Sequence, residues 1–120
     1  LESSDIRLRS EIQDGIPAIP LTSKVRHALY LATREAFHNA VRHGHPTQIT
    51  MRISIHAGIL SIVIEDNGAG FDPSATARGH GLSNMRTRLE EIGGKAQFTS
   101  TPGFGTTITF TFPIPKNSAS

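Results

Sequence analysis

The amino-acid sequence predicts an α/β fold, a two-layer sandwich in which a mixed, largely antiparallel sheet of about five strands is covered by helices on one face only. Two observations support this prediction. Segments with the period of a strand and segments with the period of a helix follow one another in the order strand, helix, strand, strand, helix, strand, strand. Nearly every strand carries its apolar residues on one side, as in a sheet with one buried face.

The first strand is predicted over residues 5–12, where apolar side chains alternate with polar and charged ones. Ile6, Leu8 and Ile12 share one side, so we expect this strand to be half-buried. A glycine and two prolines at positions 15, 17 and 20 then exclude regular structure before the next element.

A long helix is predicted over residues 22–43, with Thr22 or Ser23 as its N-cap and Gly44 after its end. At about 100° per residue, its apolar residues form one stripe. The stripe consists of Val25, Ala28, Leu29, Ala32, Ala36 and Ala40. The polar residue Asn39 falls inside it.

Two further strands, over residues 49–56 and 59–66, are predicted to form a hairpin through the dipeptide Ala57-Gly58. On the second of these strands, the apolar residues at positions 60, 62 and 64 share a face with Asp66. A carboxylate therefore points toward the side that the strand buries.

The C-terminal third of the chain is predicted to contain a helix and two strands. The helix is marked by apolar residues at helical spacing, which are Leu82, Met85, Leu89 and Ile92, and Gly93-Gly94 ends it. The strands cover residues 95–99 and 106–113. On the last strand, Thr106 shares a face with isoleucine and phenylalanine side chains.

Composition limits the class of protein. We interpret residues 1–120 as one domain, with the domain proper at about 5–113 and a tail at 114–120. No apolar run reaches the roughly 20 residues of a membrane span, and the absence of cysteine excludes disulfides and thiolate metal sites. The net charge of +2 is too small to indicate nucleic acid as a partner.

The chain starts at Leu1, and we expect it to be a piece of a longer protein. The expected location of this piece is the cytoplasm, without membrane contact of its own. Whether the parent protein is anchored in a membrane stays open.

Four polar side chains are aimed at or near the predicted core, and they are Glu35, Asn39, Asp66 and Thr106. A buried polar side chain costs about 1 to 3 kcal/mol when it has no partner. These four side chains therefore either bond one another and nearby backbone, or bind one ligand. The second interpretation also accounts for two nearby glycine pairs. The pairs are Gly68 with Gly70 and Gly79 with Gly81.

The second glycine pair suggests a phosphate site, although the common phosphate motifs are absent. The sequence contains no Gly-x-x-x-x-Gly-Lys-Ser/Thr loop, and a dinucleotide pattern starting at Gly79 has Asn84 in place of its last glycine. Residues 79–81 do precede a helix, whose free amides favour a phosphate. An ordinary flexible loop explains the same glycines equally well.

Four segments together resemble the motifs of the Bergerat-fold nucleotide-binding family, which includes gyrase B, the ninety-kilodalton heat-shock chaperones, mismatch-repair ATPases and sensor histidine kinases. They are residues 35–43 (EAFHNAVRH), 66–71 (DNGAGF), 79–82 (GHGL) and 105–106 (GT), in the family's order. Within the family, residues 81–94 and the short connection after Phe71 are most similar to short-lid histidine kinases of the nitrate-sensor type.

The resemblance implies that the chain binds ATP together with Mg²⁺. On the base side, it implies that Asp66 accepts a hydrogen bond from the adenine amino group and that Thr106 reaches adenine directly or through water. Gly68 and Gly70 would let the backbone approach the base and would form the hinge of a lid over residues 72–78.

On the phosphate side, the resemblance implies that Asn39 binds the Mg²⁺ ion and that Glu35 orients a water molecule or the ligands of the metal. Arg42 and His43 would reach toward the phosphates. The amides of the third motif would surround the terminal phosphate, and its residues are Gly79, His80, Gly81 and Leu82. For His80, a phosphate contact and simple exposure both stay open.

The resemblance also implies partners. A histidine kinase of this kind transfers the γ-phosphoryl group to a histidine on a separate dimerisation domain, from which it passes to a response regulator. None of the six histidines here is followed by an acidic residue, as the family's acceptor typically is, so we expect no autophosphorylation by the isolated chain. Two alternatives stay open, an anti-sigma-factor serine kinase of the same fold and a non-catalytic nucleotide-binding docking module.

Overall fold

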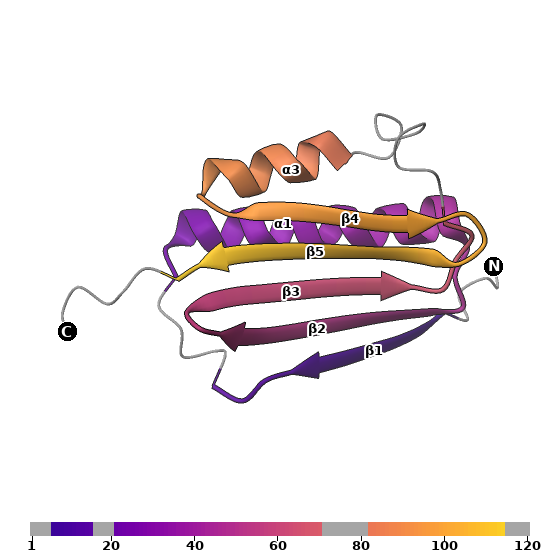
Figure 1. Ribbon diagram of the computed structural model, residues 1–120, viewed down its shortest axis with the longest axis horizontal. Coiled ribbons are helices and arrows are strands. Elements are labelled where there is room, and N and C mark those ends of the chain that lie inside the picture. The colour runs from indigo at the N-terminus through magenta and orange to yellow at the C-terminus, as the bar shows by residue number, and fades with distance from the viewer. Residues whose placement is uncertain (1–5, 16–20, 71–81, 115–120) are drawn as a thin grey trace.

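In the computed structural model, which describes residues 6–15, 21–70 and 82–114, five strands form one sheet and two α-helices lie on the same face of it (Figure 1). The elements are β1 (Arg7–Ile12), α1 (Ser23–Asn39), β2 (Gln48–His56), β3 (Ile59–Asp66), α3 (Leu82–Glu91), β4 (Lys95–Thr101) and β5 (Gly105–Pro113). The strand order is β1-β2-β3-β5-β4; β1 and β2 are parallel and the other neighbours antiparallel. The predicted two-layer sandwich is confirmed.

The start of α1 is the predicted one, whereas its end has a feature that the sequence pattern did not indicate. Thr22 is the N-cap, and its Oγ1 accepts a hydrogen bond of 3.2 Å from the Val25 N–H. After Asn39 the chain continues in a π-helical turn, Ala40–Gly44, and His45 then adopts a left-handed φ of 47°. A single widened turn is too short to leave a periodic signal in sequence.

The predicted hairpin of β2 and β3 is confirmed. Ala57 and Gly58 form its turn with positive φ angles of 53° and 78°, the combination whose twist suits a two-residue hairpin loop. The register pairs Ile49 on β2 with Asp66 on β3. This register keeps Asp66 on the face that the helices cover.

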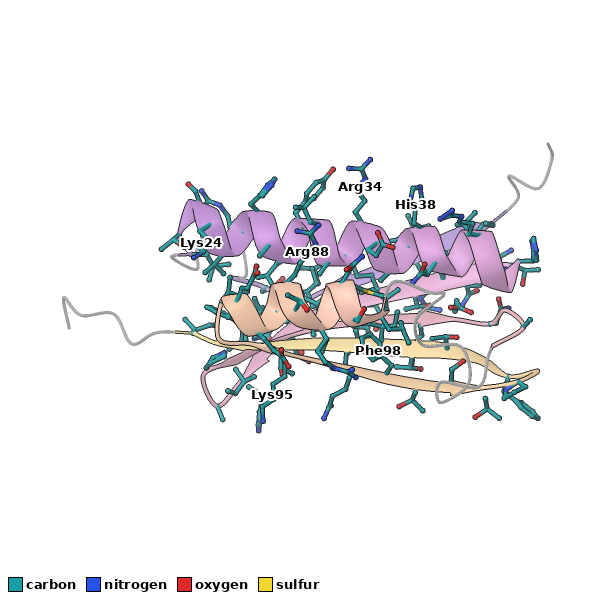
Figure 2. The ribbon with its side chains drawn as sticks, turned by 90° about the horizontal axis from the view of Figure 1, so that it is seen from above. Lys24, Arg34, His38, Arg88, Lys95 and Phe98 are labelled. Atoms are coloured by element: carbon teal, nitrogen blue, oxygen red, sulfur yellow. The ribbon has the colours of Figure 1, made fainter. Side chains whose placement is uncertain are left out.

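The hydrophobic core lies between the helices and the sheet. Its most deeply buried side chains come from both layers and include Ala32, Ala36, Met85, Leu89, Ile64 and Phe110. In the view from above, Arg34 and His38 project from α1 away from the sheet (Figure 2). The predicted buried faces of α1, α3, β3 and β5 are therefore correct.

The prediction of a half-buried first strand is wrong. Every residue of β1 is exposed, and Leu8 and Ile12 keep 64% and 51% of their surface accessible. The reason is the position of β1 in the sheet. It is an edge strand beside β2, and α3 lies near the other edge of the sheet (Figure 1). Alternation along a strand indicates which side chains share a face, but not whether a helix reaches that face.

Truncating a core residue should therefore cost far more stability than truncating the apolar side of β1. Met85→Ala should lower the free energy of unfolding by about 2 to 5 kcal/mol, because Met85 is fully buried. Leu8→Ala should change it by less than about 1 kcal/mol. Urea denaturation of both variants measures the difference. Equal losses would mean that β1 is covered in solution.

No α-helix in the described ranges is both long and apolar enough to cross a membrane.

Candidate functional site

The two residues predicted to contact the base, Asp66 and Thr106, meet where β3 ends and β5 begins. Asp66 is the last residue of β3 and pairs with Thr106 on β5. Its Oδ1 accepts a hydrogen bond of 2.8 Å from the Gly68 N–H. Burial raises the pKa of Asp66 above its ordinary value, while hydrogen bonds from the backbone of Gly68 and Thr106 act in the opposite direction. The strand register thus places a partly desolvated carboxylate at the end of the core.

Thr106 is buried on the helix-covered face, as predicted from the alternation of β5. Its Oγ1 lies 2.8 Å from the Oγ of Ser100 on β4, and the Ser100 hydroxyl also donates to the Gly105 carbonyl at 3.1 Å. Ser100 was missed by sequence reasoning, because the predicted strand ended at residue 99 within a run of hydroxyl residues. The pairing of β4 with β5 is what brings the two hydroxyls together.

The end of α1 lies against the segment that follows β3. Asn39 is the last residue of α1 and only 8% exposed, and Glu35, one turn earlier, is half-buried. Beyond Asn39, the Gly44 carbonyl accepts a hydrogen bond of 2.8 Å from the Ala69 N–H. The fold therefore brings the α1 end and the Asp66 end of β3 to one place.

The remaining predicted site residues are only partly described. Arg42 is exposed on the π-helical turn. The side chain of His43 lies outside the described residues, as does the whole segment with Gly79, His80 and Gly81. Leu82 begins α3 and is 3% exposed, so its side chain belongs to the core and only its backbone could face a ligand.

Close contacts within the fold itself explain why residues 68 and 70 are glycines. A Cβ at Gly68 would lie 2.5 Å from the Gly44 carbonyl oxygen and 2.9 Å from the Asp66 Oδ1. Gly70 has a φ of +72°, and a Cβ there would overlap the carbonyl of Thr101. These glycines therefore do not by themselves distinguish a ligand site from a closely packed junction.

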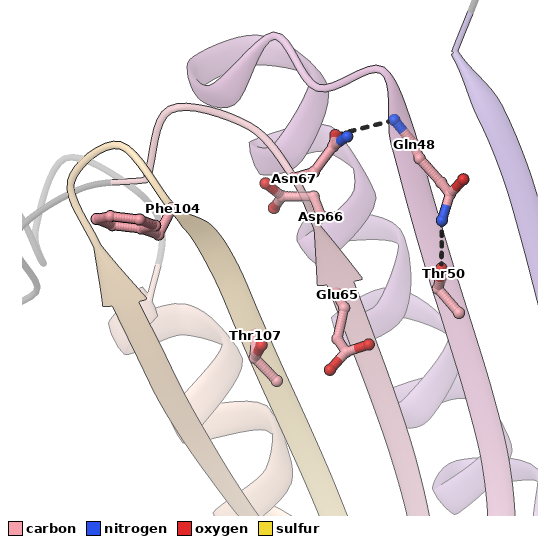
Figure 3. A pocket seen from close by; sticks show the side chains of 7 residues that line it. All are labelled: Gln48, Thr50, Glu65, Asp66, Asn67, Phe104 and Thr107. Atoms are coloured by element: carbon pink, nitrogen blue, oxygen red, sulfur yellow. Dashed lines mark hydrogen bonds between the residues drawn. The ribbon is translucent and has the colours of Figure 1, made fainter.

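The helix-free face beside this site carries ion pairs and a hollow. Glu65, the neighbour of Asp66, accepts a hydrogen bond of 2.6 Å from Arg52, which also bonds Glu11 at 3.0 Å. A hollow of about 280 Å³ opens at the same end of the sheet (Figure 3). Its lining residues are Gln48, Thr50, Glu65, Asp66, Asn67, Phe104 and Thr107. Two adjacent carboxylates thus have different environments, one partly desolvated and one paired at the surface.

The side-chain oxygens at the end of α1 are of a chemical type that can bind magnesium. Within the described ranges, no group of three or more His, Cys, Asp or Glu is placed to hold a metal. Asn39 and Glu35 offer an amide oxygen and a carboxylate, and Mg²⁺ is typically bound by one or two such oxygens together with water and phosphate.

Residues 24–116 match the family described as histidine kinase-, DNA gyrase B- and HSP90-like ATPases, and the chain belongs to this family. A sensor-like histidine kinase of Chloroflexus aurantiacus is 37% identical over 106 residues, which cover 82% of this chain and 18% of that protein. Sensor protein VraS of Staphylococcus epidermidis is 33% identical over 111 residues, 92% of this chain and 31% of VraS. The chain thus spans less than a third of either relative.

Solved structures share the fold. The ATP-binding domain of PrrB from Mycobacterium tuberculosis superposes with a TM-score of 0.72 at 25% identity, covering 93% of this chain and 82% of that domain. The blue-light-activated histidine kinase of Erythrobacter litoralis gives a TM-score of 0.78 at 18% identity, covering 97% of this chain and 37% of that kinase. The predicted membership of the ATPase family and the predicted fold class are both confirmed.

Proposed function

We propose that this chain is the ATP-binding catalytic domain of a two-component sensor histidine kinase, of the short-lid nitrate-sensor type. In this proposal it transfers the γ-phosphoryl group of ATP to a histidine on a separate dimerisation domain, for relay to a response regulator. The observation that carries it is the meeting of a partly desolvated carboxylate, Asp66, with the helix end that bears the buried amide of Asn39. The sensor-kinase relatives favour it over an anti-sigma-factor kinase.

The proposed roles follow the two sides of the site. Asp66 accepts a hydrogen bond from the adenine amino group, and Thr106 contacts adenine directly or through water. Gly68 and Gly70 form the hinge of the lid. On the other side, Asn39 binds Mg²⁺, and Glu35 orients a water molecule or the ligands of the metal. The phosphates are contacted by residues that the structure describes in part or not at all, which are Arg42, His43, Gly79, His80, Gly81 and Leu82.

In this proposal, Asn39 would hold Mg²⁺, which would supply positive charge to balance the phosphates, and ATP would supply the group that is transferred. The chain's own residues act by positioning, because they orient the nucleotide and keep its base out of water, and no side chain of this domain forms a covalent bond. In the same proposal, the domain proper is about residues 5–113 and works in the cytoplasm.

Asn39→Ala should weaken the binding of ATP in the presence of Mg²⁺ by at least roughly tenfold, because it removes one oxygen ligand from a partly desolvated site. Calorimetric titration of the isolated chain measures this affinity. Asn84→Ala on α3 is a matched control, since Asn84 is exposed, and its affinity should equal that of the wild type. Unchanged affinity in Asn39→Ala would reject the metal-side assignment.

The transfer reaction is tested with γ-labelled ATP and two proteins. The isolated chain should stay unlabelled, and label should appear on an added helical-hairpin domain that carries the acceptor histidine. An acid-labile product supports the histidine kinase. An acid-stable phosphoserine on a partner would support the anti-sigma-factor kinase instead.

A further inference from the structure

We infer that Asn67 is a positioning residue, whose side chain fastens the loop after α1 to the end of β3 and so holds the metal side and the base side of the site in one geometry. We name this set of contacts the Asn67 clamp. The clamp consists of contacts within the chain itself. Its consequence for nucleotide binding rests on the proposed function.

Three side-chain hydrogen bonds form the Asn67 clamp. The Oδ1 of Asn67 accepts from the N–H groups of Thr47 and Gln48 at 2.9 and 3.0 Å, and its Nδ2 donates to the Thr47 Oγ1 at 2.8 Å. The Asn67 N–H adds a bond of 3.3 Å to the Gln48 carbonyl. Figure 3 shows Asn67 at the end of β3 reaching to Gln48 at the start of β2. Both the oxygen and the nitrogen of the Asn67 side-chain amide are therefore hydrogen-bonded to residues 47–48.

The loop that Asn67 binds follows directly after the π-helical turn. Gly44 ends that turn, and its carbonyl accepts the Ala69 N–H at 2.8 Å. Gly44 also packs against Gly68, where an added Cβ would lie 2.5 Å from the Gly44 oxygen. The clamp at residues 47–48 and the contact at Gly44 therefore hold the same junction at two points. The end of α1, which carries Asn39, cannot shift along β3 without breaking one of them.

The exposure of Asn67 separates this role from core packing. Because the residue is exposed, Asn67→Ala leaves no cavity, and the released N–H groups of Thr47 and Gln48 can bond water. The variant should therefore fold with a looser junction. Asn67→Asp is the conservative variant, because a carboxylate accepts both N–H groups and the Thr47 hydroxyl can donate to it instead of accepting.

The first experiment measures amide hydrogen exchange in the ligand-free chain. In Asn67→Ala, the Ala69 N–H, which bonds Gly44, should exchange at least roughly tenfold faster than in the wild type. The protection of core amides on β5 should change much less. In Asn67→Asp the Ala69 rate should stay within about threefold of the wild type. An unchanged Ala69 rate in Asn67→Ala would overturn the clamp.

The second experiment measures the affinity for ADP in the presence of Mg²⁺ and in the presence of a chelator. The ratio of the two affinities is the gain that the metal produces, and this gain is compared between the variants and the wild type. In Asn67→Ala this gain should fall at least roughly fivefold, whereas Asn67→Asp should retain it. General destabilisation would weaken both affinities in equal proportion and leave the gain unchanged, which would overturn the positioning role. If the wild type does not bind ADP, the proposed function fails, and the exchange rates still decide whether the clamp exists.

Discussion

Asp66→Asn is expected to weaken ATP binding by about 10- to 100-fold without destabilising the fold. The carboxylate should accept a hydrogen bond from the adenine amino group, and a hydrogen bond to a charged group contributes about 1.5 to 3 kcal/mol. The substitution keeps a carbonyl oxygen for the Gly68 N–H, which bonds the Asp66 Oδ1 at 2.8 Å in the wild type. ATP binding is therefore weakened while the local hydrogen bond to Gly68 survives.

The same substitution should change how stability depends on pH. Burial raises the pKa of Asp66 above its ordinary value of 3.8. The folded state thus holds this proton more tightly than the unfolded state, and the ionised group opposes folding. This cost is absent below pH 3.8 and grows as the pH rises through the raised pKa. Asp66→Asn should therefore unfold at the same or a higher temperature than the wild type at pH 7, and this advantage should vanish in acid.

The affinity for ATP should show the corresponding pH dependence. Because only the ionised carboxylate is a pure acceptor, wild-type affinity should fall as the pH is lowered through the raised pKa of Asp66. Asp66→Asn should lack this fall. Calorimetric titration from neutral pH down toward the ordinary pKa of 3.8 would measure both.

Glu65→Gln is the matched control for Asp66→Asn. The two carboxylates are neighbours on β3, but Glu65 lies on the helix-free face, where it bonds Arg52 at 2.6 Å and is 40% exposed. Its replacement should leave the affinity for ATP unchanged. The base-side assignment fails if Glu65→Gln and Asp66→Asn lose affinity equally, or if neither does.

The sequence was sufficient to predict the features that repeat along an element. Alternation in β3 and β5 placed Asp66 and Thr106 on the covered face, and helical spacing placed Asn39 among the buried residues of α1. Each of these predictions uses several residues of one pattern. They are also the predictions that bring the polar side chains of the candidate site together.

Features that depend on a contact between distant segments were not predictable in the same way. The exposure of Leu8 depends on where the helices cross the sheet, and the contact of Ser100 with Thr106 depends on the exact length of β4. Asn67 lies inside a recognisable motif, yet its bonds reach residues about twenty positions earlier in the chain. A motif indicates that the residue matters locally, but not which loop it holds.

Gly105→Ala is expected to lower stability strongly for a single substitution at the candidate site. Gly105 begins β5 with a φ of +91°, and a Cβ there would overlap the carbonyl oxygen of Asp66. The backbone conformation alone costs an alanine about 1 to 3 kcal/mol, and displacing the adjacent strand adds a similar amount. We therefore expect a loss of about 3 to 5 kcal/mol in the free energy of unfolding.

Gly103→Ala isolates the contribution of the close contact. Gly103 lies in the same β4–β5 turn with a similar φ of +86°, but a Cβ at this position would meet no atom within 4 Å. In this variant the free energy of unfolding should fall only by the cost of the backbone conformation, about 1 to 2 kcal/mol. Urea denaturation of the two variants gives both losses, and their difference measures the contact with Asp66. Because Gly105→Ala also displaces Asp66, its folded fraction should bind ATP more weakly than Gly103→Ala does. Equal losses in the two variants would mean that the Asp66 carbonyl does not restrict this glycine.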